Sequence, residues 1–224
     1  MPDVPLARKI VSKFAEFAEA NEKLFLKNRV FTVNLMSSPG SGKTSLIERT
    51  IPELAGRVKM AVIEGDIETD RDARRIRALG IKAVQITTHG ACHLDAKMIS
   101  NVLEELSIDQ LDLLLIENVG NLVCPANFFL GEDTRVVVAS VPEGDDKPLK
   151  YPEAFHGSRA CVINKIDLAP YVNFDLLHFK NAVRAANPRI LTFETSCRTG
   201  AGITEWCRWL EEGVTAKKSG LASS

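Results

Sequence analysis

A glycine-rich segment that ends in a lysine and a threonine carries the plainest chemistry in this sequence. Residues 37–44 read Ser-Ser-Pro-Gly-Ser-Gly-Lys-Thr and stand between an apolar run and a stretch with helical spacing. They match the P-loop pattern, except that Ser37 occupies the position of its first glycine. Glycine lets the backbone pass close to phosphate groups, whose charge then meets the amide groups of a helix N-terminus. The segment therefore predicts a nucleotide phosphate site.

Two side chains of this segment have definite expected roles. Lys43 should reach the β- and γ-phosphates, and the Thr44 hydroxyl should bind Mg²⁺. A glycine-rich turn that only joins a strand to a helix is the alternative, but the intact Gly-Lys-Thr between those two elements favours phosphate binding. The residues expected to hold the phosphates are Gly40, Ser41, Gly42, Lys43, Thr44 and Ser45.

A later segment predicts which base the nucleotide carries. Residues 164–167, Asn-Lys-Ile-Asp, end an apolar run and resemble the base-specificity motif of GTPases. The Asp167 carboxylate can accept hydrogen bonds from the N1–H and exocyclic amine of guanine, whereas adenine would leave it desolvated and unpaired. Asn164 can brace the loop, and the Lys165 stem can cover one face of the base. Residues 196–200 resemble the short loop behind the guanine O6 in such proteins. GTP is therefore favoured over ATP, and the residues expected at the base are Asn164, Lys165, Asp167, Ser196 and Cys197.

Carboxylates near the ends of two apolar runs could supply the magnesium and water chemistry. Asp66 closes the second run, Asp72 follows in a loop that enters a helix, and Glu117 closes the fourth run. A carboxylate at the carboxyl end of a strand lies in the ligand crevice of an open α/β sheet. We expect Asp66 to join Thr44 at Mg²⁺, although which carboxylate binds the ion directly stays open. The residues expected to take part in catalysis are Lys43, Asp66, Asp72 and Glu117.

Two other segments carry soft metal ligands. Cys92 and His93 follow the third apolar run, and Cys124 follows the fourth. Thiolate and imidazole groups suit Zn²⁺ or Ni²⁺ and not Mg²⁺. Three ligands are one short of a closed tetrahedral site, so water or a second subunit would complete it. His89 is a further possible ligand, and an adjacent Cys-His pair is by itself a weak signal.

The elements that must position these residues alternate between short β-rich runs and helical stretches. Val, Ile and Leu fill several runs without strict alternation, as expected for strands buried on both faces. This order predicts a three-layer α/β fold, with a mostly parallel sheet flanked by helices. The expected strands are residues 30–36, 58–63, 81–87, 111–116, 135–141, 159–164 and 189–193. The expected helices between them are residues 44–54, 71–79, 94–106 and 174–186.

The domain organisation expected from this pattern is simple. Residues 1–28 form an amphipathic helix, with Leu6 and Ile10 among its apolar positions, that packs on a GTPase domain of residues 29–215. Residues 216–224 form a flexible tail.

Composition excludes several classes of protein. The 224 residues carry 28 Lys and Arg against 29 Asp and Glu, a formal net charge of −1 that argues against a general nucleic-acid binder. The longest aliphatic runs are far too short for a membrane span, and the charged N-terminus lacks the apolar stretch of a secretory signal. The five scattered cysteines do not suggest a disulfide scaffold. We expect a cytoplasmic enzyme or switch that binds neither nucleic acid nor membrane.

Taken together, the motifs resemble HypB, the family of hydrogenase nickel-incorporation GTPases. The segments that carry the resemblance are residues 38–44, 92–96, 117–125, 143–147 and 164–167. The resemblance implies a P-loop GTPase of the SIMIBI class, grouped with signal-recognition-particle and urease-maturation GTPases. It implies Mg²⁺-dependent hydrolysis of GTP to GDP, a homodimer formed with GTP, and help in delivering nickel to the [NiFe] hydrogenase precursor alongside a nickel-delivery co-chaperone. It also implies that Cys92, His93 and Cys124 bind Ni²⁺ or Zn²⁺, and that Asp66 and Asp72 belong to a switch region.

Two alternatives and one departure accompany this interpretation. A urease-type nickel GTPase typically carries Cys-Pro-His, whereas Cys92 and His93 are adjacent here. A nucleotide switch without a metal, acting through partner docking, would use the N-terminal helix as a docking element. No cysteine precedes Cys92 and the histidines form no cluster, so we do not expect the N-terminal nickel storage found in some members of the family.

Overall fold

The centre of the protein is a seven-stranded sheet with the order β3-β2-β4-β1-β5-β6-β7, and every neighbouring pair of strands is parallel. The computed structural model describes residues 4–220, with side chains described from residue 13 onward. All of the predicted strands are present, so the expected α/β class is confirmed. The strands are β1 (Phe31–Ser37), β2 (Met60–Asp66), β3 (Lys82–Thr87), β4 (Leu113–Gly120), β5 (Thr134–Ser140), β6 (Ala160–Asn164) and β7 (Leu191–Glu194).

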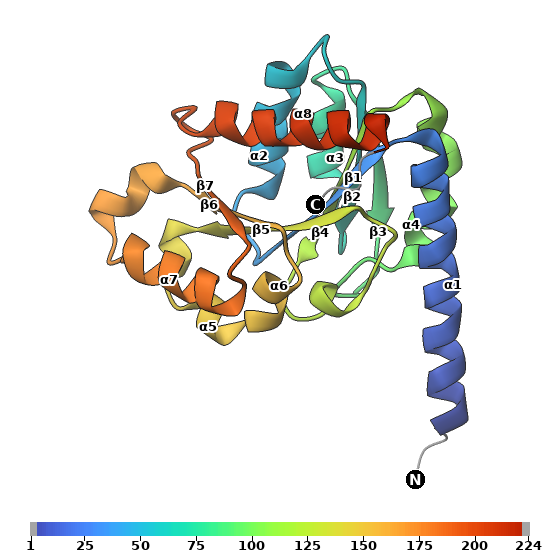
Figure 1. Ribbon diagram of the computed structural model, residues 1–224, viewed down its shortest axis with the longest axis horizontal. Helices are drawn as coiled ribbons and strands as arrows, with labels where there is room; N and C mark the ends of the chain where they lie inside the picture. The colour runs from blue at the N-terminus through green and yellow to red at the C-terminus, as the bar shows by residue number, and fades with distance from the viewer. Residues whose placement is uncertain (1–3, 221–224) are drawn as a thin grey trace.

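Helices cover both faces of this sheet, which gives three layers (Figure 1). One face is covered by α2, α3 and α8, and the other by α1 and α4 at one end and by α5, α6 and α7 at the other. The helices are α1 (Val4–Asn28), α2 (Lys43–Leu54), α3 (Arg71–Arg77), α4 (Ala96–Val102), α5 (Lys147–Lys150), α6 (Pro152–His156), α7 (Leu176–Ala186) and α8 (Ile203–Ser219).

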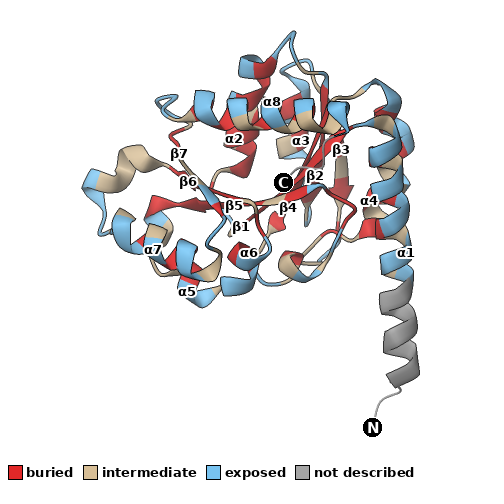
Figure 2. Cartoon of the chain, viewed as in Figure 1, coloured by how far each residue is buried: buried red, intermediate tan, exposed pale blue. Residues whose placement is uncertain are grey.

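The central strands are buried on both faces because successive side chains of a strand point in opposite directions. Figure 2 shows them as a continuous buried band inside a shell of helices whose outer faces are exposed. On β4, Leu113 and Leu115 pack beneath α2 and α8, whereas Leu114 and Ile116 face the core under α1 and α4. The same alternation places Cys161 in the core under α6 and α7. Apolar runs without polar alternation are thus explained by burial from two sides.

Helix α1 is held against α4 and the loop before β5 by a buried amide as well as by apolar contacts. Ala18 and Phe25 are buried, and the Asn21 side chain donates to the carbonyl oxygens of Ala96 and Leu130, at 2.8 and 2.9 Å. The helix occupies the range expected for it, although the predicted apolar positions Leu6 and Ile10 lie outside the residues whose side chains are described.

The C-terminal region differs from the prediction. No bounds were predicted for helix α8, although Cys207 between two tryptophans indicates a helical packing position; the helix extends to Ser219, so the part of the expected flexible tail from Ala216 to Ser219 is helical. Residues 221–224 lie outside the described residues. The helix is held by Trp206, which is fully buried and donates from its indole nitrogen to Thr50 of α2 at 2.9 Å. None of the helices in the described part of the chain has the length and apolar character needed to cross a bilayer.

Parallel strands all end at one edge of the sheet, and ligands of open α/β sheets bind outside that edge. The segments that follow β1, β2, β3, β4 and β6 contain the candidate residues for phosphate, magnesium, soft metal and base. The topology therefore brings these candidates to one side of the molecule.

Helix α8 packs so closely on the sheet that Gly213 has no room for a side chain. A Cβ atom added at this position would overlap the buried Phe31 ring. Alanine at an exposed helical position normally stabilises relative to glycine, but we expect Gly213→Ala to lower the free energy of unfolding by about 1–3 kcal/mol through overpacking. Urea unfolding would measure the change, with Glu212→Ala on the exposed side of α8 as the control. Equal or higher stability of Gly213→Ala would contradict this account of the packing.

Candidate functional site

The loop after β1 has the shape of a phosphate cradle. Gly40 and Gly42 have φ angles of 78° and 97°, in the left-handed region that favours glycine. Gly42 is the N-cap of α2, and a Cβ atom there would lie 2.5 Å from the Asn164 side-chain nitrogen. This glycine is thus required both by the turn and by the close approach of the loop that follows β6.

The lysine and the threonine of this loop already have oxygen partners. The Lys43 ammonium donates to the Ser37 hydroxyl at 2.7 Å and lies 3.9 Å from a Glu117 carboxylate oxygen. The Thr44 hydroxyl donates to the same oxygen, Glu117 Oε1, at 2.9 Å. Lys43, Thr44 and Glu117 are all buried. A buried cation and a buried carboxylate thus stand beside the helix N-terminus, where phosphate and its metal ion would bind.

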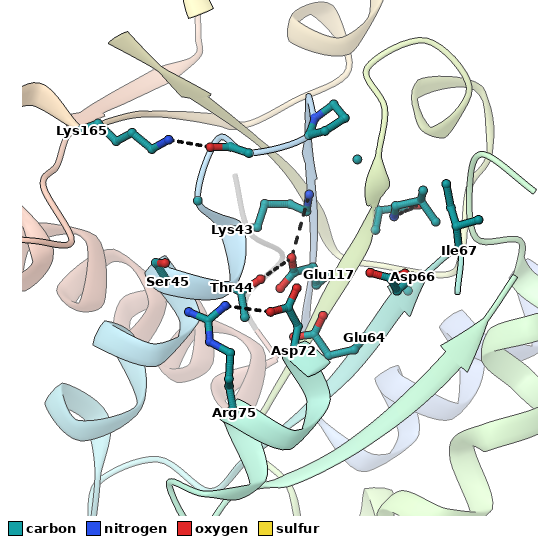
Figure 3. Close-up of a pocket in the computed structure, with 17 residues that line it drawn as sticks. Lys43, Thr44, Ser45, Glu64, Asp66, Ile67, Asp72, Arg75, Glu117 and Lys165 are labelled. Carbon is teal, nitrogen blue, oxygen red and sulfur yellow. Dashed lines mark hydrogen bonds and ion pairs between the residues drawn. The ribbon is translucent and has the colours of Figure 1, made fainter. Parts of the chain in front are cut away.

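A cavity of about 470 Å³ opens at this point, and Figure 3 shows the side chains that line it. A second cavity of about 440 Å³ lies beside it and shares Gly42, Ser45 and Lys165. The first contains the candidate phosphate and magnesium groups and the second the candidate base groups. Because the two cavities adjoin, a nucleotide fits across them with its phosphates on the cradle and its base near β6.

The structure adds Glu64, a residue that the sequence analysis did not assign to the site. Glu64 lies on β2 in register with Glu117 on β4, and both carboxylates line the first cavity (Figure 3). Glu64 Oε1 and Glu117 Oε2 are buried without a hydrogen-bond partner. Two ionised carboxylates would leave these oxygens without a donor, which is costly; a proton held between the two glutamates, or a bound cation with its water, satisfies them. Only the strand register could have revealed this pair.

Burial and mutual repulsion change the ionisation of these two groups. Desolvation, followed by the charge of Glu117, raises the pKa of Glu64 to about 11. Desolvation also raises the pKa of Glu117, opposed by the positive charge of Lys43. Two carboxylates in one dry site do not both ionise without a cation. In the absence of a ligand, Glu64 is therefore neutral at pH 7.

The two aspartates of the predicted switch region line the same cavity but have other partners. Asp66 accepts hydrogen bonds from the backbone amides of Glu68 and Thr69, at 2.9 and 3.1 Å. Asp72 pairs with Arg75 at 2.7 Å, and Arg75 in turn pairs with Glu48 of α2. Asp66 therefore shapes its own loop, whereas Asp72 is held by an arginine that also lines the cavity.

The base side of the site is braced by its own side chains. The Asn164 amide donates to the Ser41 carbonyl at 2.9 Å, and the Lys165 ammonium donates to the Gly40 carbonyl at 2.6 Å, so the loop after β6 holds the phosphate cradle. Asp167 accepts from the Ser196 hydroxyl at 2.6 Å. Asp167 and Cys197 line the second cavity, whereas Ser41 and Ser196 are fully buried behind the loops they support. The expected base residues are thus brought together.

The soft ligands also meet, although they come from different segments. The sulfur atoms of Cys92 and Cys124 are 2.9 Å apart, and His93 Nδ1 lies 3.7 Å from the Cys92 sulfur. The ligand atoms of all three residues lie within 4.8 Å of one another. Adjacent residues of a strand would point apart, but residues 92 and 93 lie in a loop, so both side chains can face Cys124. Two sulfur atoms and one imidazole nitrogen suit Ni²⁺ or Zn²⁺.

The histidine of this cluster is held by an aromatic neighbour. The His93 ring stacks on Phe128, with ring centroids 3.9 Å apart. Partial burial lowers the pKa of His93, which favours the neutral, metal-binding form. Hydrogen bonding with Cys124 raises the pKa of Cys92, so a metal ion must displace a proton from this pair of thiols. His89, the further ligand considered from sequence, is not part of the cluster found among the described residues.

Fold and site together define a P-loop nucleoside-triphosphatase fold with a Cys/His cluster beside the nucleotide cavity. Residues 31–194 match the family model of the CobW/HypB/UreG nucleotide-binding domain. The chain belongs to this family and, within it, to the HypB hydrogenase maturation factors.

Similarity to individual HypB proteins extends over most of the chain. The hydrogenase maturation factor HypB of Azotobacter vinelandii is 50% identical over 202 residues, which cover 90% of this chain and 67% of that protein. The crystal structure of HypB from Archaeoglobus fulgidus has a TM-score of 0.85 and 43% identity, covering 91% of this chain and 99% of the other. The crystal structure of HypB from Helicobacter pylori in complex with nickel has a TM-score of 0.86 and 38% identity, and the match covers 95% of this chain and 98% of that chain.

The buried carboxylate pair predicts an unusual pH dependence of stability. A carboxyl whose pKa is raised by folding binds more protons in the folded state, so its contribution to stability falls as pH rises above about 4.5. Glu64→Gln keeps the shape of the neutral group and removes this loss. We expect the magnesium- and nucleotide-free variant to be more stable than wild type at pH 8, and its stability to decline less steeply with pH, by up to about 1.4 kcal/mol per pH unit.

Urea unfolding at several pH values in the presence of a chelator would measure both slopes. The exposed Glu68→Gln serves as the control, since it should leave the slope unchanged. Parallel pH profiles for wild type and Glu64→Gln would show that Glu64 is already ionised in the folded protein.

Proposed function

We propose that this protein is a GTP-hydrolysing metallochaperone that assists nickel insertion into the [NiFe] hydrogenase precursor. The observation that carries the proposal is the cluster of Cys92, His93 and Cys124 at the same sheet edge as the nucleotide cavity. Binding and hydrolysis of a nucleotide can switch a protein between two states. The soft-ligand site on adjoining loops gives such a switch a metal-binding function to control. Membership of the HypB family supports the same function.

Guanine is the base that the second cavity fits best. The Asp167 side chain is largely buried, and Arg198 Nε lies 3.7 Å from its second oxygen, so the carboxyl group is fixed at the edge of the cavity as a hydrogen-bond acceptor. Guanine offers two donors to such a group, and adenine offers none in that position. Asn164 and Lys165 connect this loop to the phosphate cradle, so base recognition and phosphate binding are joined mechanically.

Hydrolysis would depend on charge neutralisation and positioning, without a covalent intermediate. Lys43 would exchange the Ser37 hydroxyl for phosphate oxygens. Mg²⁺ when bound would neutralise charge on the β- and γ-phosphates, and Thr44 with Asp66 would hold it, as expected from the sequence. The unpartnered oxygens of Glu64 and Glu117 fit the same ion or its water molecules. Lys43, Asp66, Asp72 and Glu117 remain the residues assigned to catalysis.

The nickel ion is cargo in this proposal, and Zn²⁺ is its natural competitor because ligand softness alone does not separate the two. A homodimer formed with GTP would bring two three-ligand sites together and complete them. Metal is then handed to the hydrogenase large-subunit precursor with the help of a nickel-delivery co-chaperone, in the cytoplasm. The HypB of Helicobacter pylori, whose crystal structure contains nickel, supports the choice of metal.

Direct contacts connect the nucleotide cavity with the metal cluster. At Gly120, a Cβ atom would stand only 3.0 Å from the Pro39 backbone, so the end of β4 touches the phosphate loop. Next to it, the Asn121 amide donates to the Cys92 carbonyl at 3.3 Å. On the other side, the Thr88 amide donates to the Asp66 carbonyl at 2.9 Å. A movement of the loop that follows Asp66, or of the segment that follows β4, would therefore shift the loop that carries Cys92.

Two alternatives are less well supported. A urease-type nickel GTPase would be expected to carry a proline between Cys92 and its histidine, and here the two are adjacent. A docking switch without a metal leaves the approach of three soft ligands unexplained.

The base assignment predicts a change of nucleotide preference. Asp167→Asn should lose GTP affinity by about 1.4 kcal/mol or more, a tenfold effect, and gain affinity for xanthosine triphosphate, because the amide complements the xanthine carbonyl. Direct binding of both nucleotides and phosphate release would measure it, and Asp175→Asn at the start of α7 is the control. Unchanged preference for GTP would reject the base assignment, and a wild type that releases no phosphate from GTP would reject the GTPase.

The metal assignment predicts loss of both binding and response. Cys92→Ala and Cys124→Ala should each abolish stoichiometric Ni²⁺ or Zn²⁺ binding and metal-responsive dimerisation with a non-hydrolysable GTP analogue. Wild-type affinity should fall on acidification, because both thiols and the imidazole must lose protons to bind. Metal analysis and oligomer mass are the measurements, and Cys207→Ala, a core thiol, is the control. Full metal content and metal-responsive dimerisation in both site variants would refute the assignment.

A further inference from the structure

Three buried polar side chains and the half-buried Arg135 form a chain of hydrogen bonds next to the segments that carry the Cys/His cluster. The Asn118 amide donates to Asn34 Oδ1 at 3.2 Å, and the Asn34 amide donates to Glu132 Oε1 at 3.3 Å. The same Glu132 oxygen accepts from Arg135 Nε at 2.6 Å. Asn34, Asn118 and Glu132 are at most 5% exposed. We call these four residues the buried relay.

The two ends of the buried relay hold the two segments that carry the metal ligands. At one end, Asn118 Oδ1 accepts from the backbone amide of Leu94, directly after His93, at 3.0 Å. At the other end, Arg135 donates to the carbonyl of Ala126, two residues after Cys124, at 2.7 Å. Glu132 also accepts from the Leu130 amide, at 2.6 Å, just beyond the Phe128 ring that stacks on His93. The relay therefore connects the segment that follows His93 with the segment that follows Cys124.

Strand β4, which carries Asn118, also lines the nucleotide cavity. Glu117 and Asn118 are successive residues of β4, so their side chains point to opposite faces of the sheet. Glu117 accepts from Thr44 of the phosphate cradle, whereas Asn118 accepts from the segment with His93. A shift of this strand end when Glu117 changes partners would move Asn118 by a similar amount.

We propose that Asn34 and Asn118 are positioning residues that couple nucleotide state to the geometry of the Cys92, His93 and Cys124 site. This inference deepens the proposed function and rests on it. Buried polar groups are satisfied as sets, so a displaced Asn118 must move its partners or lose their hydrogen bonds. Displacement of Asn118 therefore changes the separation of His93 and Cys124 through both ends of the relay.

Asn34 is the informative position, because among the relay residues it neither lines the nucleotide cavity nor belongs to the Cys/His cluster, and it reaches the cavity lining only through Asn118. Asn34→Leu keeps the shape of the side chain and removes both of its relay hydrogen bonds. Thr32→Val is a matched control: Thr32 lies on the same face of β1 and is equally buried, and its hydroxyl has no hydrogen-bond partner. Nickel affinity is measured for each protein with GDP and with a non-hydrolysable GTP analogue, both with Mg²⁺.

We expect the nucleotide to change the nickel Kd of wild type and Thr32→Val by about fivefold or more, and that of Asn34→Leu by less than about twofold. Thermal melting and GDP affinity confirm that each variant is folded. A wild-type response in folded Asn34→Leu would overturn the relay while leaving the metal assignment intact. A wild type whose nickel affinity ignores the nucleotide would overturn both the relay and the proposed coupling.

A measurement on wild type keeps the inference testable even where Asn34→Leu does not fold. The amides of Leu94 and Leu130 donate to relay side chains, whereas the Met98 amide donates to Asp95, outside the relay. Replacing GDP by the GTP analogue in metal-free protein should change hydrogen exchange at Leu94 and Leu130 by about fivefold or more, and not at Met98. Unchanged exchange at both relay amides would refute the inference.

Discussion

The parallel pairing of β4 with both β1 and β2 is the interaction on which the arrangement of the site depends. It places Glu117 beside Glu64 on one flank and carries Gly120 to the backbone of the phosphate loop on the other. The chain then continues through Asn121 to Cys124 without leaving the same edge of the sheet. Because backbone hydrogen bonds fix this register, the nucleotide cavity and the Cys/His cluster keep a defined relation in space. Helices α2 and α8 on one face and α1 and α4 on the other hold the pairing in place.

Desolvated charge is the second constraint. The site contains a lysine and two glutamates at the edge of an apolar core, where isolated charges are costly. Lys43 and Glu117 offset one another in part, and the second glutamate is accommodated by keeping its proton. Such a site is poised for ligands that carry both signs of charge. A nucleotide phosphate with a divalent cation has that character.

Much of this could be predicted from the sequence because the information is local. The phosphate loop follows a strand and opens a helix, and Lys43 and Thr44 are defined by their places in it. Glu64 and Asn118 could not be assigned in this way, since their roles depend on which strands are neighbours and in what register. The approach of Cys92 to Cys124 likewise depends on how the segments after β3 and β4 are brought together. In addition, a loop conformation, and not the residue spacing, turns His93 toward the sulfur atoms. The spacing of Trp206, Cys207 and Trp209 indicates a helical packing surface, but the bounds of α8 could not be set from it, and the helix extends into the expected tail.

Ser37, where the P-loop pattern has glycine, has a consequence for how the site behaves between ligands. Its hydroxyl donates to the Ser38 carbonyl and accepts from Lys43, so the ammonium of Lys43 has a neutral oxygen to rest on. Departure of a nucleotide then need not leave a bare cation in a dry pocket, and arrival of the next exchanges one oxygen ligand for another. A glycine at position 37 would have no hydroxyl and could not supply this oxygen. Ser37 therefore gives the phosphate loop an internal hydrogen-bond partner for Lys43 that the usual P-loop pattern does not provide.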